Sequence, residues 1–303
     1  MTGEFQIAII GAGPAGLSAA LTLSRALRPV IVFDSPRAPR NAASPGFGGL
    51  LGRERATAAD LHAIGREEIE RYGFARFHGA DAARIEQVPG GGFSILGADG
   101  TRATAAVVLL ACGMVDRFPE IRRLDDFWNR SAVYCPFCDG FELRDGPRGV
   151  FVNRPEMLDA AEIYLTWTDD LILFLDTGIA VPTEREAALA AKGGRVERRA
   201  IRGLRVDAPD QQAVEMADGS AIERQALVLW PSQAQTELVR EMGLPLDDAA
   251  QVAVDDGYRT GLSGVYAAGD LLYAGRQNGN TTIHMDAMAA AAIMADLAMK
   301  PDQ

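Results

Sequence analysis

The segment at residues 6–35, QIAIIGAGPAGLSAALTLSRALRPVIVFDS, restricts the possible folds of this chain more than any other stretch of the sequence. It predicts a strand, a glycine-rich turn, an amphipathic helix and a second strand, which together form a βαβ unit. Gly11 permits the tight turn, Gly13 lets the backbone approach a pyrophosphate, and Gly16 lets the helix lie close to the strand. Because a helix N-terminus attracts phosphate, the segment predicts a dinucleotide-binding site.

The second half of this signature is an acidic residue at the end of the second strand, where a carboxylate accepts ribose hydroxyls. Asp34 stands at that place. A glycine-rich turn without a ligand is the alternative, and the strand, helix and acid in this order argue against it. The cofactor-binding residues that we expect in and after the loop are Pro14, Ala15, Ser35, Arg40 and Asn41. For Arg40 and Asn41, which could reach phosphate or ribose, a solvated loop is the equal alternative.

Length and composition limit the class of protein. The chain has 303 residues, of which 48% are hydrophobic, so it can form about two domains with cores of their own. Its net charge of −11 disfavours nucleic acid and anionic membrane surfaces as partners. The sequence contains no uninterrupted apolar run of roughly 18 residues, and its start does not resemble a signal peptide. We therefore expect a soluble cytoplasmic protein that binds neither nucleic acid nor a membrane.

A pattern that occurs twice in the sequence predicts a second domain of the same kind. Residues 93–113 and 212–232 each predict a strand, an Asp-Gly turn, another strand and an apolar strand. Residues 148–178 again predict strand, helix and strand, with Asp176 at the end of the second strand. The predicted fold class is α/β, with two nucleotide-binding, Rossmann-like, three-layer domains and the first interrupted by the second. The first domain would comprise 1–115 plus 245–303, and the smaller second domain 116–244.

The segment VYCPFCDGFE contains two of the three cysteines, Cys135 and Cys138. Thiols at i and i+3 near a helix start can form a small disulfide ring, and the helix N-terminus lowers the pKa of the nearest thiol. A zinc site needs four ligands, but only Cys112 and three scattered histidines remain, so we predict no metal site. A structural disulfide across two residues closes almost no loop. The pair therefore predicts redox chemistry, and Cys112, in an apolar strand, is expected to be a buried small side chain.

Together, these features resemble the low-molecular-weight thioredoxin reductase family of flavoproteins over nearly the whole chain. The motifs that carry the resemblance are GAGPAG, CPFCDG and YAAGD. The resemblance implies FAD in the first domain, normally NADPH in the second, a homodimer, and a cysteine pair that passes electrons between flavin and a disulfide or dithiol. The segments RALRPVIVFDS, RNAAS, REEIERYG and CPFCDGFE look most like the branch of gliotoxin- and holomycin-type dithiol oxidases. Those enzymes close a disulfide in a small molecule and pass the electrons to oxygen.

The resemblance also implies roles for individual residues. Cys138 would face the flavin, Cys135 would exchange with a small dithiol or a thioredoxin-like protein, and Asp139 would move the proton. The plain alternative for Asp139 is a helix cap or turn residue. The dithiol oxidases usually carry histidine at this place, so Asp139 is the reductase-like choice. Further cofactor-binding residues implied in the first domain are Gly113, Gly269, Asp270, Thr281 and Thr282.

The last helix, predicted within GNTTIHMDAMAAAAIMADLAM, is apolar almost all round, as is typical of a helix buried against a core or in a dimer contact. In the family, its N-terminus points at the flavin, which would stabilise the anionic reduced form. His284 near this N-terminus is a candidate proton donor to the flavin. A residue without a chemical role is the alternative for His284.

One departure from the family pattern bears on the electron donor. Where the second domain should carry a glycine-rich phosphate loop, this sequence has Asn153, Arg154 and Pro155. Their side chains would crowd a pyrophosphate, and Pro155 has no N–H to offer it. We therefore predict an FAD-dependent dithiol oxidase that does not use NADPH. The alternatives are another loop geometry that still binds a pyridine nucleotide, a reductase fed by ferredoxin, by a second flavin in the vacated groove or by another donor, and a non-enzymatic redox sensor.

Overall fold

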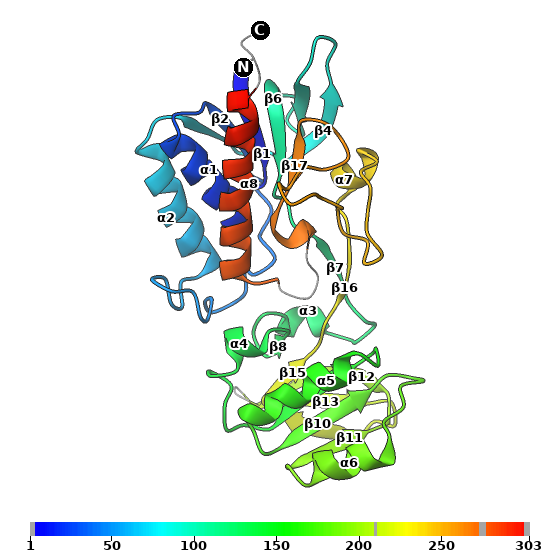
Figure 1. Cartoon of the computed structure of the whole chain (residues 1–303). Coiled ribbons are helices and arrows are strands. Elements are labelled where there is room, and N and C mark those ends of the chain that lie inside the picture. Colours follow the sequence, from blue (N-terminus) through cyan, green and yellow to red (C-terminus); the bar gives the residue numbers. More distant parts are fainter. Residues whose placement is uncertain (1–3, 209–210, 273–276, 300–303) are drawn as a thin grey trace. The chain divides into compact units, whose positions relative to one another are not determined.

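The computed structural model describes residues 4–208, 211–272 and 277–299 (Figure 1). The chain forms two compact units. The first unit consists of Met1–Ala42, Ala56–Asp116 and Gln233–Gln303, and the second of Ala43–Arg55 and Arg117–Ser232. The chain therefore leaves the first unit twice and returns to it twice.

The first unit is built on a seven-stranded sheet with the strand order β3-β2-β1-β6-β5-β4, in which β17 also pairs with β6. The strands are β1 (Glu4–Ile10), β2 (Val30–Phe33), β3 (Ala75–His78), β4 (Ala82–Gln87), β5 (Phe93–Gly97), β6 (Arg102–Leu110) and β17 (Val265–Ala267). One edge of β6 pairs with β1, while its other edge pairs antiparallel with β5 and then parallel with β17. The strand β2 and the C-terminal halves of β1 and β6 are apolar runs because both faces of this part of the sheet are covered.

Alternate residues of these strands enter two separate cores. Ile7 and Ile9 lie in the core under the helices, and Ala8 and Ile10 lie in the core on the opposite face. The helices of the first core are α1 (Pro14–Arg25) and α8 (Gly279–Met299), which lie side by side (Figure 1). The Ser18 hydroxyl donates to the carbonyl of Ile283 at 2.7 Å and joins the two helices. The unit also contains α2 (Ala58–Glu70), α7 (Glu237–Glu241) and the short 3₁₀ helix η2 (Gly269–Leu271).

The second unit contains a five-stranded parallel sheet with the order β11-β10-β9-β15-β8 and a three-stranded antiparallel sheet. The parallel strands are β8 (Ala132–Val133), β9 (Arg148–Val152), β10 (Leu171–Leu175), β11 (Gly194–Glu197) and β15 (Ala226–Val228). The antiparallel strands are β12 (Ile201–Ala208), β13 (Gln211–Met216) and β14 (Ala221–Arg224). The helices are α3 (Leu124–Phe127), α4 (Pro136–Asp139), α5 (Met157–Glu162), η1 (Ile163–Thr166) and α6 (Thr183–Ala190). The strands β7 (Val115–Arg117) and β16 (Ser232–Ala234) pair where the chain passes between the units.

The fold class predicted from the sequence is the one that forms, but the limits of the compact units differ from the predicted domains. Residues 233–244, which the sequence placed in the second domain, belong to the first unit. The reason is that α7 packs against β4, and Val239 and Leu244 are part of the first unit's core. Residues 43–55 belong to the second unit instead of the first. There, Gly48 lies so close to the Cys138 carbonyl that a Cβ at Gly48 would be 2.1 Å from its oxygen.

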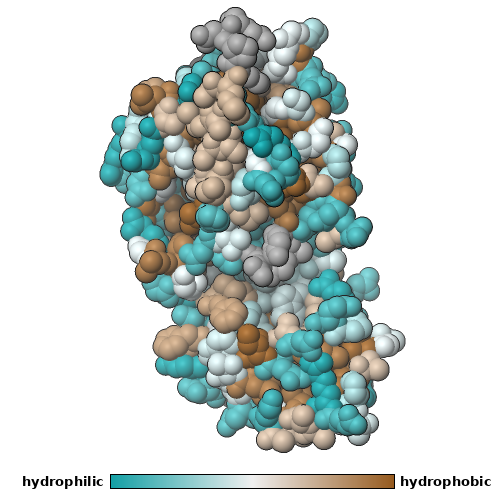
Figure 2. Space-filling model, in the orientation of Figure 1, coloured by the Kyte–Doolittle hydropathy of each residue, from teal (hydrophilic) through white to brown (hydrophobic). Residues whose placement is uncertain are grey.

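Helix α8 is apolar almost all round, as its composition indicates, but only one of its faces is buried within this chain. Its buried residues form one face, whereas Met288 and Met299 are 47% and 72% exposed. Figure 2 shows the outer face of α8 as a continuous tan strip of moderately hydrophobic residues. By length and composition alone, α8 could cross a membrane, but it carries a fully buried aspartate, Asp286, and packs against α1 as core helices do.

Candidate active site

The turn between β1 and α1 forms an open cradle. Gly11 has φ 109°, and a Cβ there would lie 2.5 Å from the carbonyl oxygen of Ala111. A Cβ on Gly16 would lie 1.9 Å from the carbonyl oxygen of Gly11, so neither glycine can be replaced without a shift of the backbone. Gly13 is different, because a Cβ there would have nothing within 4 Å. Gly13 is also the N-cap of α1, has no side chain to cap the helix, and precedes Pro14, so the first N–H groups of α1, starting at Ala15, have neither an intrahelical partner nor a side-chain cap.

Asp34 follows β2, as predicted, but it already has partners. Its Oδ2 atom lies 2.8 Å from Nε2 of His62 and 3.8 Å from Nη1 of Arg66, both on α2. Sequence reasoning missed this pair, because nothing in the local pattern connects α2 with the end of β2. Ser35 accepts a hydrogen bond from the Arg37 N–H at 3.2 Å and shapes the turn that follows.

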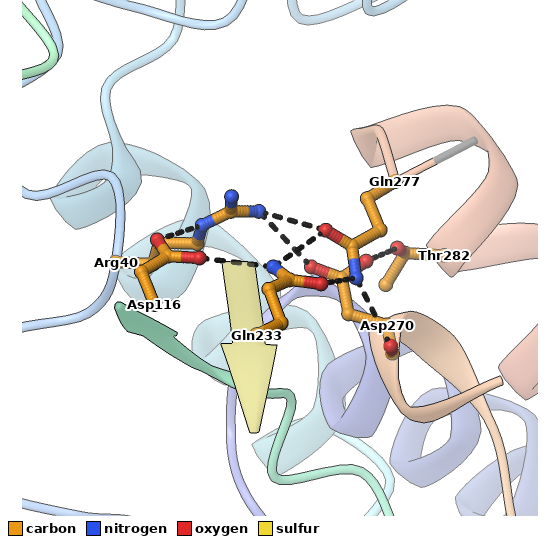
Figure 3. A network of polar contacts seen from close by, with 6 residues as sticks. All are labelled: Arg40, Asp116, Gln233, Asp270, Gln277 and Thr282. Carbon is orange, nitrogen blue, oxygen red and sulfur yellow. Dashed lines mark hydrogen bonds and ion pairs between the residues drawn. The ribbon is translucent and has the colours of Figure 1, made fainter. Parts of the chain in front are cut away.

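Arg40 belongs to a polar network in the first unit (Figure 3). Its Nε atom lies 2.6 Å from Oδ2 of Asp116, and its Nη1 atom lies 3.6 Å from Oδ2 of Asp270. The six side chains of the network are Arg40, Asp116, Gln233, Asp270, Gln277 and Thr282. Arg40 thus holds two carboxylates in place, where the sequence suggested contact with phosphate or ribose. Asn41 is half-buried beside it in a turn and is outside the network.

Asp270 and α8 meet at the glycine cradle. The Thr282 hydroxyl donates to Oδ1 of Asp270 at 3.2 Å, and burial raises the pKa of Asp270 while Arg40 lowers it. A Cβ at Gly269 would lie 3.1 Å from Cβ of Ala15 and 3.3 Å from Oδ2 of Asp286. Gly269, with φ 70°, therefore brings the loop of α1 and the side of α8 together.

Asp286 is a site residue that the sequence did not single out. It is fully buried, and neither of its carboxylate oxygens has a hydrogen-bond partner among the residues that the structure describes. Burial, with the nearby Asp270 carboxyl as a second cause, raises the pKa of Asp286 well above its ordinary value. A buried carboxyl without a partner is costly, so its protonated form is favoured and has a hydrogen bond to offer.

The remaining predicted cofactor residues lie at strand and helix ends. Gly113 follows β6 with φ 66°. The Thr281 N–H donates to Oδ1 of Asn278 at 3.0 Å, so Asn278 caps the start of α8. His284 is exposed, and the structure does not bring it to Asp270 or Asp286. Its predicted role as a proton donor has no contact in its favour within the described part of the chain.

In the second unit, Cys135 and Cys138 form the predicted disulfide. Cys135 is the N-cap of α4, and its Sγ atom accepts a hydrogen bond from the Cys138 N–H at 3.1 Å. Negative charge on the Cys135 sulfur would therefore be stabilised by this donor. Gly140 packs against an indole ring, because a Cβ there would lie 2.9 Å from Trp167. Phe137, between the cysteines, meets the same ring edge to face at 5.9 Å between centroids.

Asp139 directly follows this pair and is tuned for proton transfer. Burial raises its pKa to about 6; the charge of Glu142 adds to this, while Arg55 and Arg148 oppose it. Arg55 and Glu142 themselves form an ion pair at 3.4 Å. A carboxyl that titrates near pH 6 can both donate and accept a proton close to neutral pH.

The turn between β9 and α5 has none of the features of the first cradle. No residue from 153 to 156 has a positive φ, and α5 is six residues long. Asn153 buries its Oδ1 atom without a partner among the described residues, whereas Arg154 and Pro155 are exposed. Asp176, after β10, is exposed and accepts a hydrogen bond from the Thr177 N–H at 2.8 Å.

The third cysteine is separate from the redox pair. Cys112 is half-buried, its Sγ atom lies 3.8 Å from Oγ1 of Thr236, and burial raises the pKa of its thiol. A raised pKa makes a thiol less reactive, which fits a packing role. Across residues 4–208, 211–272 and 277–299, no group of three or more His, Cys, Asp or Glu side chains is placed to hold a metal ion.

Comparison with known proteins agrees with this arrangement. The family described as pyridine nucleotide-disulphide oxidoreductase matches residues 5–153 and 186–292. Thioredoxin reductase tcpT of Claviceps purpurea is 29% identical, with 86% of this chain and 85% of that protein covered. The structure of an oxidoreductase from Agrobacterium tumefaciens is similar with a TM-score of 0.90 and 28% identity, covering 99% of this chain and all of that one. The crystal structure of HlmI gives a TM-score of 0.88 and 29% identity, covering 97% of this chain and 93% of that one.

Proposed function

Because the chain belongs to the pyridine nucleotide-disulphide oxidoreductase family, and within it to the thioredoxin reductase-like flavoproteins, we propose that it is an FAD-dependent dithiol oxidase that does not use NADPH. The observation that carries the proposal is the contrast between its two strand–turn–helix loops. The first is an open glycine cradle, and the second contains no glycine and a shortened helix.

The first unit would hold the FAD. The first N–H groups of α1 would bind the pyrophosphate, Asp34 would accept ribose hydroxyls with its remaining oxygen, and Asp270 at the same cradle would offer a further polar contact to the cofactor. The open space at Gly13 and the partnerless carboxyl of Asp286 both fit a polar ligand at this place. FAD, when bound, supplies the acceptor for two electrons and can pass them to oxygen, which becomes hydrogen peroxide.

The second unit would supply the thiol exchange. A thiolate of the substrate dithiol attacks Sγ of Cys135, the bond between the two cysteine sulfurs breaks, and Cys138 leaves as a thiolate. The second substrate thiolate then attacks the mixed disulfide, so the substrate leaves as a disulfide and both cysteines are reduced. The substrate gives up two electrons and two protons in these steps. Asp139 accepts a proton from a substrate thiol and donates it to the cysteine sulfur that leaves as a thiolate.

Several features of the second unit support independence from NADPH. The turn at Asn153 has a buried side-chain oxygen where a glycine loop would offer backbone N–H groups. Pro155 has no N–H, and α5 is too short to present a long helix dipole to a phosphate. The segment after Asp176 reads TGIAVPTE, without the basic residues that a 2′-phosphate would need.

The second candidate is a thioredoxin-like disulfide reductase that takes electrons from a donor other than NADPH. Asp139 favours it, because histidine is the usual residue at this place in the dithiol oxidases that the chain resembles. The same exchange steps would then run in reverse, from the reduced cysteines to a substrate disulfide.

We also propose that the protein is a homodimer. The outer face of α8 supports this, since it exposes Met288 and a strip of alanines to solvent (Figure 2). Such exposed apolar strips on helices commonly mark interaction surfaces. Light scattering coupled to size-exclusion chromatography tests it, and Met288→Lys is expected to shift the mass toward that of a monomer.

Anaerobic stopped-flow absorbance of the FAD-loaded protein tests the proposed function. Dithiothreitol is expected to bleach the flavin, and air to restore its colour. NADPH and NADH are expected to bleach it no faster than the buffer does. Fast bleaching by NADPH would show that the protein is an ordinary NADPH-dependent reductase. Bleaching by dithiol without recovery in air would favour the second candidate, a disulfide reductase with another electron donor. The variant Cys138→Ser is expected to abolish the dithiol reaction, and Cys112→Ser to leave it intact.

A further inference from the structure

Arg148, the first residue of β9, is a buried charge without a complete set of partners. Its side chain is 1% exposed. One of its Nη groups donates to the Leu143 carbonyl, whereas Nε and the other Nη have no hydrogen-bond partner among the described residues. An isolated buried guanidinium costs far more than a buried neutral group, so this charge needs a counter-charge nearby.

The surroundings of Arg148 connect it with the redox helix from two sides. The Leu143 N–H donates to the carbonyl of Asp139 at 3.1 Å, so the residue that Arg148 binds is itself bonded to the end of α4. On the other side, the Arg148 guanidinium lies 5.7 Å from the centre of the Tyr164 ring. The Tyr164 hydroxyl donates to the carbonyl of Tyr134, immediately before Cys135, at 3.2 Å. Arg148 is thus in contact with groups that hold both ends of the cysteine segment.

Two titratable groups face Arg148 electrostatically, and only one of them can become its counter-charge near neutral pH. Burial raises the pKa of Tyr164 well above 10, so the phenol stays neutral. The other group is Asp139. The charged groups that act on Asp139 besides Arg148 are Glu142 and Arg55, which already pair with each other.

We propose that Arg148 is a positioning residue that acts through Asp139: it is the internal counter-charge that stabilises the Asp139 carboxylate left behind when Asp139 gives its proton to a cysteine sulfur. The use of that proton rests on the proposed function, but the charge pairing does not. When a thiolate forms on opening of the disulfide, the proton moves from the Asp139 carboxyl to that sulfur. The summed charge of the Asp139 carboxyl and the cysteine sulfur is unchanged by this transfer. The new Asp139 carboxylate then faces the Arg148 cation, which is already in place.

A direct titration of Asp139 tests this. The probe is the side-chain carboxyl ¹³C resonance of aspartate-labelled protein in its disulfide form, and Asp139→Asn identifies the signal. In Arg148→Met, we expect the Asp139 midpoint to rise by about one pH unit, a tenfold increase in proton affinity. Arg148→Lys, which keeps the charge, should return most of that change. An unchanged midpoint in Arg148→Met would overturn the proposal.

Arg224 offers a matched control. It is also a buried arginine of the second unit, 5% exposed, but it pairs with Asp170 at 2.8 Å. Arg224→Met should lower stability and leave the Asp139 midpoint where it is. An equal shift in both variants would mean that general loosening, not charge, moves the titration. If Arg148→Met does not fold, Arg148→Gln replaces it, since glutamine keeps donors but no charge.

The measurement separates this inference from the proposed function. The titration uses the oxidised protein and needs neither dithiol nor turnover. If the protein fails to oxidise dithiols but Arg148→Met shifts the Asp139 midpoint, the charge pair is supported and the proposed reaction is overturned. If the protein oxidises dithiols but Arg148→Met leaves the Asp139 midpoint unchanged, the proposed reaction is supported and the role of Arg148 is overturned.

Discussion

The two strand–helix–strand segments of this chain, β1–α1–β2 and β9–α5–β10, have the same order of elements and opposite features at the turn. In the first, Gly11 and Gly16 lie where any Cβ would collide with backbone, and α1 runs for 12 residues. In the second, no residue of the turn has a positive φ, and α5 runs for six residues before it passes into the 3₁₀ helix η1. Yet β9 and β10 are buried over their whole length, as β2 is. The sheet needs apolar strands, and only a phosphate needs the glycines.

The largest expected effect comes from filling the cradle. Gly13 has φ −68° and open space at its Cβ, so Gly13→Glu should fold normally and put a carboxylate where phosphate would bind. FAD content is expected to fall by about tenfold or more, because the two negative charges repel each other. Arg154→Glu makes a comparable change in the second turn and should leave FAD content unchanged, measured by absorbance after gel filtration. Equal losses in the two variants would contradict the contrast between the turns.

The second unit should respond to pH through Asp139. Its pKa rises from 3.8 in the unfolded chain to about 6 in the fold, so folding favours the protonated form. The free-energy cost of ionising Asp139 in the fold is absent below about pH 4, grows between about pH 4 and 6, and levels off above pH 6 at no more than about 3 kcal/mol. Asp139→Asn is therefore expected to stabilise the protein above pH 6 and to have little effect at pH 4, measured by urea unfolding. Asp145→Asn, at a side chain that is 89% exposed, is the control and should show no such pH dependence.

A smaller effect distinguishes the helix starts of the two units. Thr57 and Asp60 form a reciprocal capping box at α2, whereas α5 starts after Glu156 without a side-chain cap. Thr57→Ala should cost about 1 kcal/mol of unfolding free energy, and Glu156→Ala should stay within roughly 0.5 kcal/mol of the parent. Thermal unfolding of both variants provides the comparison. A cost at Glu156 equal to that at Thr57 would mean that α5 has a cap that its contacts do not show.

The smallest expected effect concerns repair of the second turn. In the double variant Asn153→Gly, Arg154→Gly, we expect anaerobic NADPH still to leave the flavin oxidised. Glycines allow close approach, but they do not lengthen α5 or restore the basic residues missing after Asp176. The appearance of NADPH-dependent bleaching would show that the turn residues alone keep the nucleotide out.

Motifs whose physical cause is local could be predicted from the sequence. The glycine cradle could be predicted from a strand, GAGPAG and a helix in direct succession, and the disulfide from two thiols one helical turn apart. The fold class could be predicted because the same order of strands and turns occurs in residues 93–113 and 212–232.

Contacts between distant segments could not be predicted in the same way. No pattern at Asp34 indicates His62, and no pattern at Arg40 indicates Asp116 and Asp270 as its partners. In the sequence, Asp286 is one polar residue of a predicted helix and Arg148 is one charged residue of a predicted strand. Nothing near either residue in the sequence indicates that it is buried. Their chemistry comes from burial, which depends on elements far away in the chain.

The interruption of the first unit also sets an order for folding during synthesis. Ser18 in α1 bonds to a carbonyl 265 residues later, and α8 and β17 complete the cores on both faces of the first sheet. Until the ribosome has made those elements, the side of α1 that packs against α8 stays uncovered, although β1, β2 and α2 already cover the rest of its apolar surface. The second unit lacks no segment by the time residue 232 has emerged, since its parts lie before that point. A nascent chain can therefore hold a finished disulfide helix while its cofactor cradle is still open and in need of a chaperone.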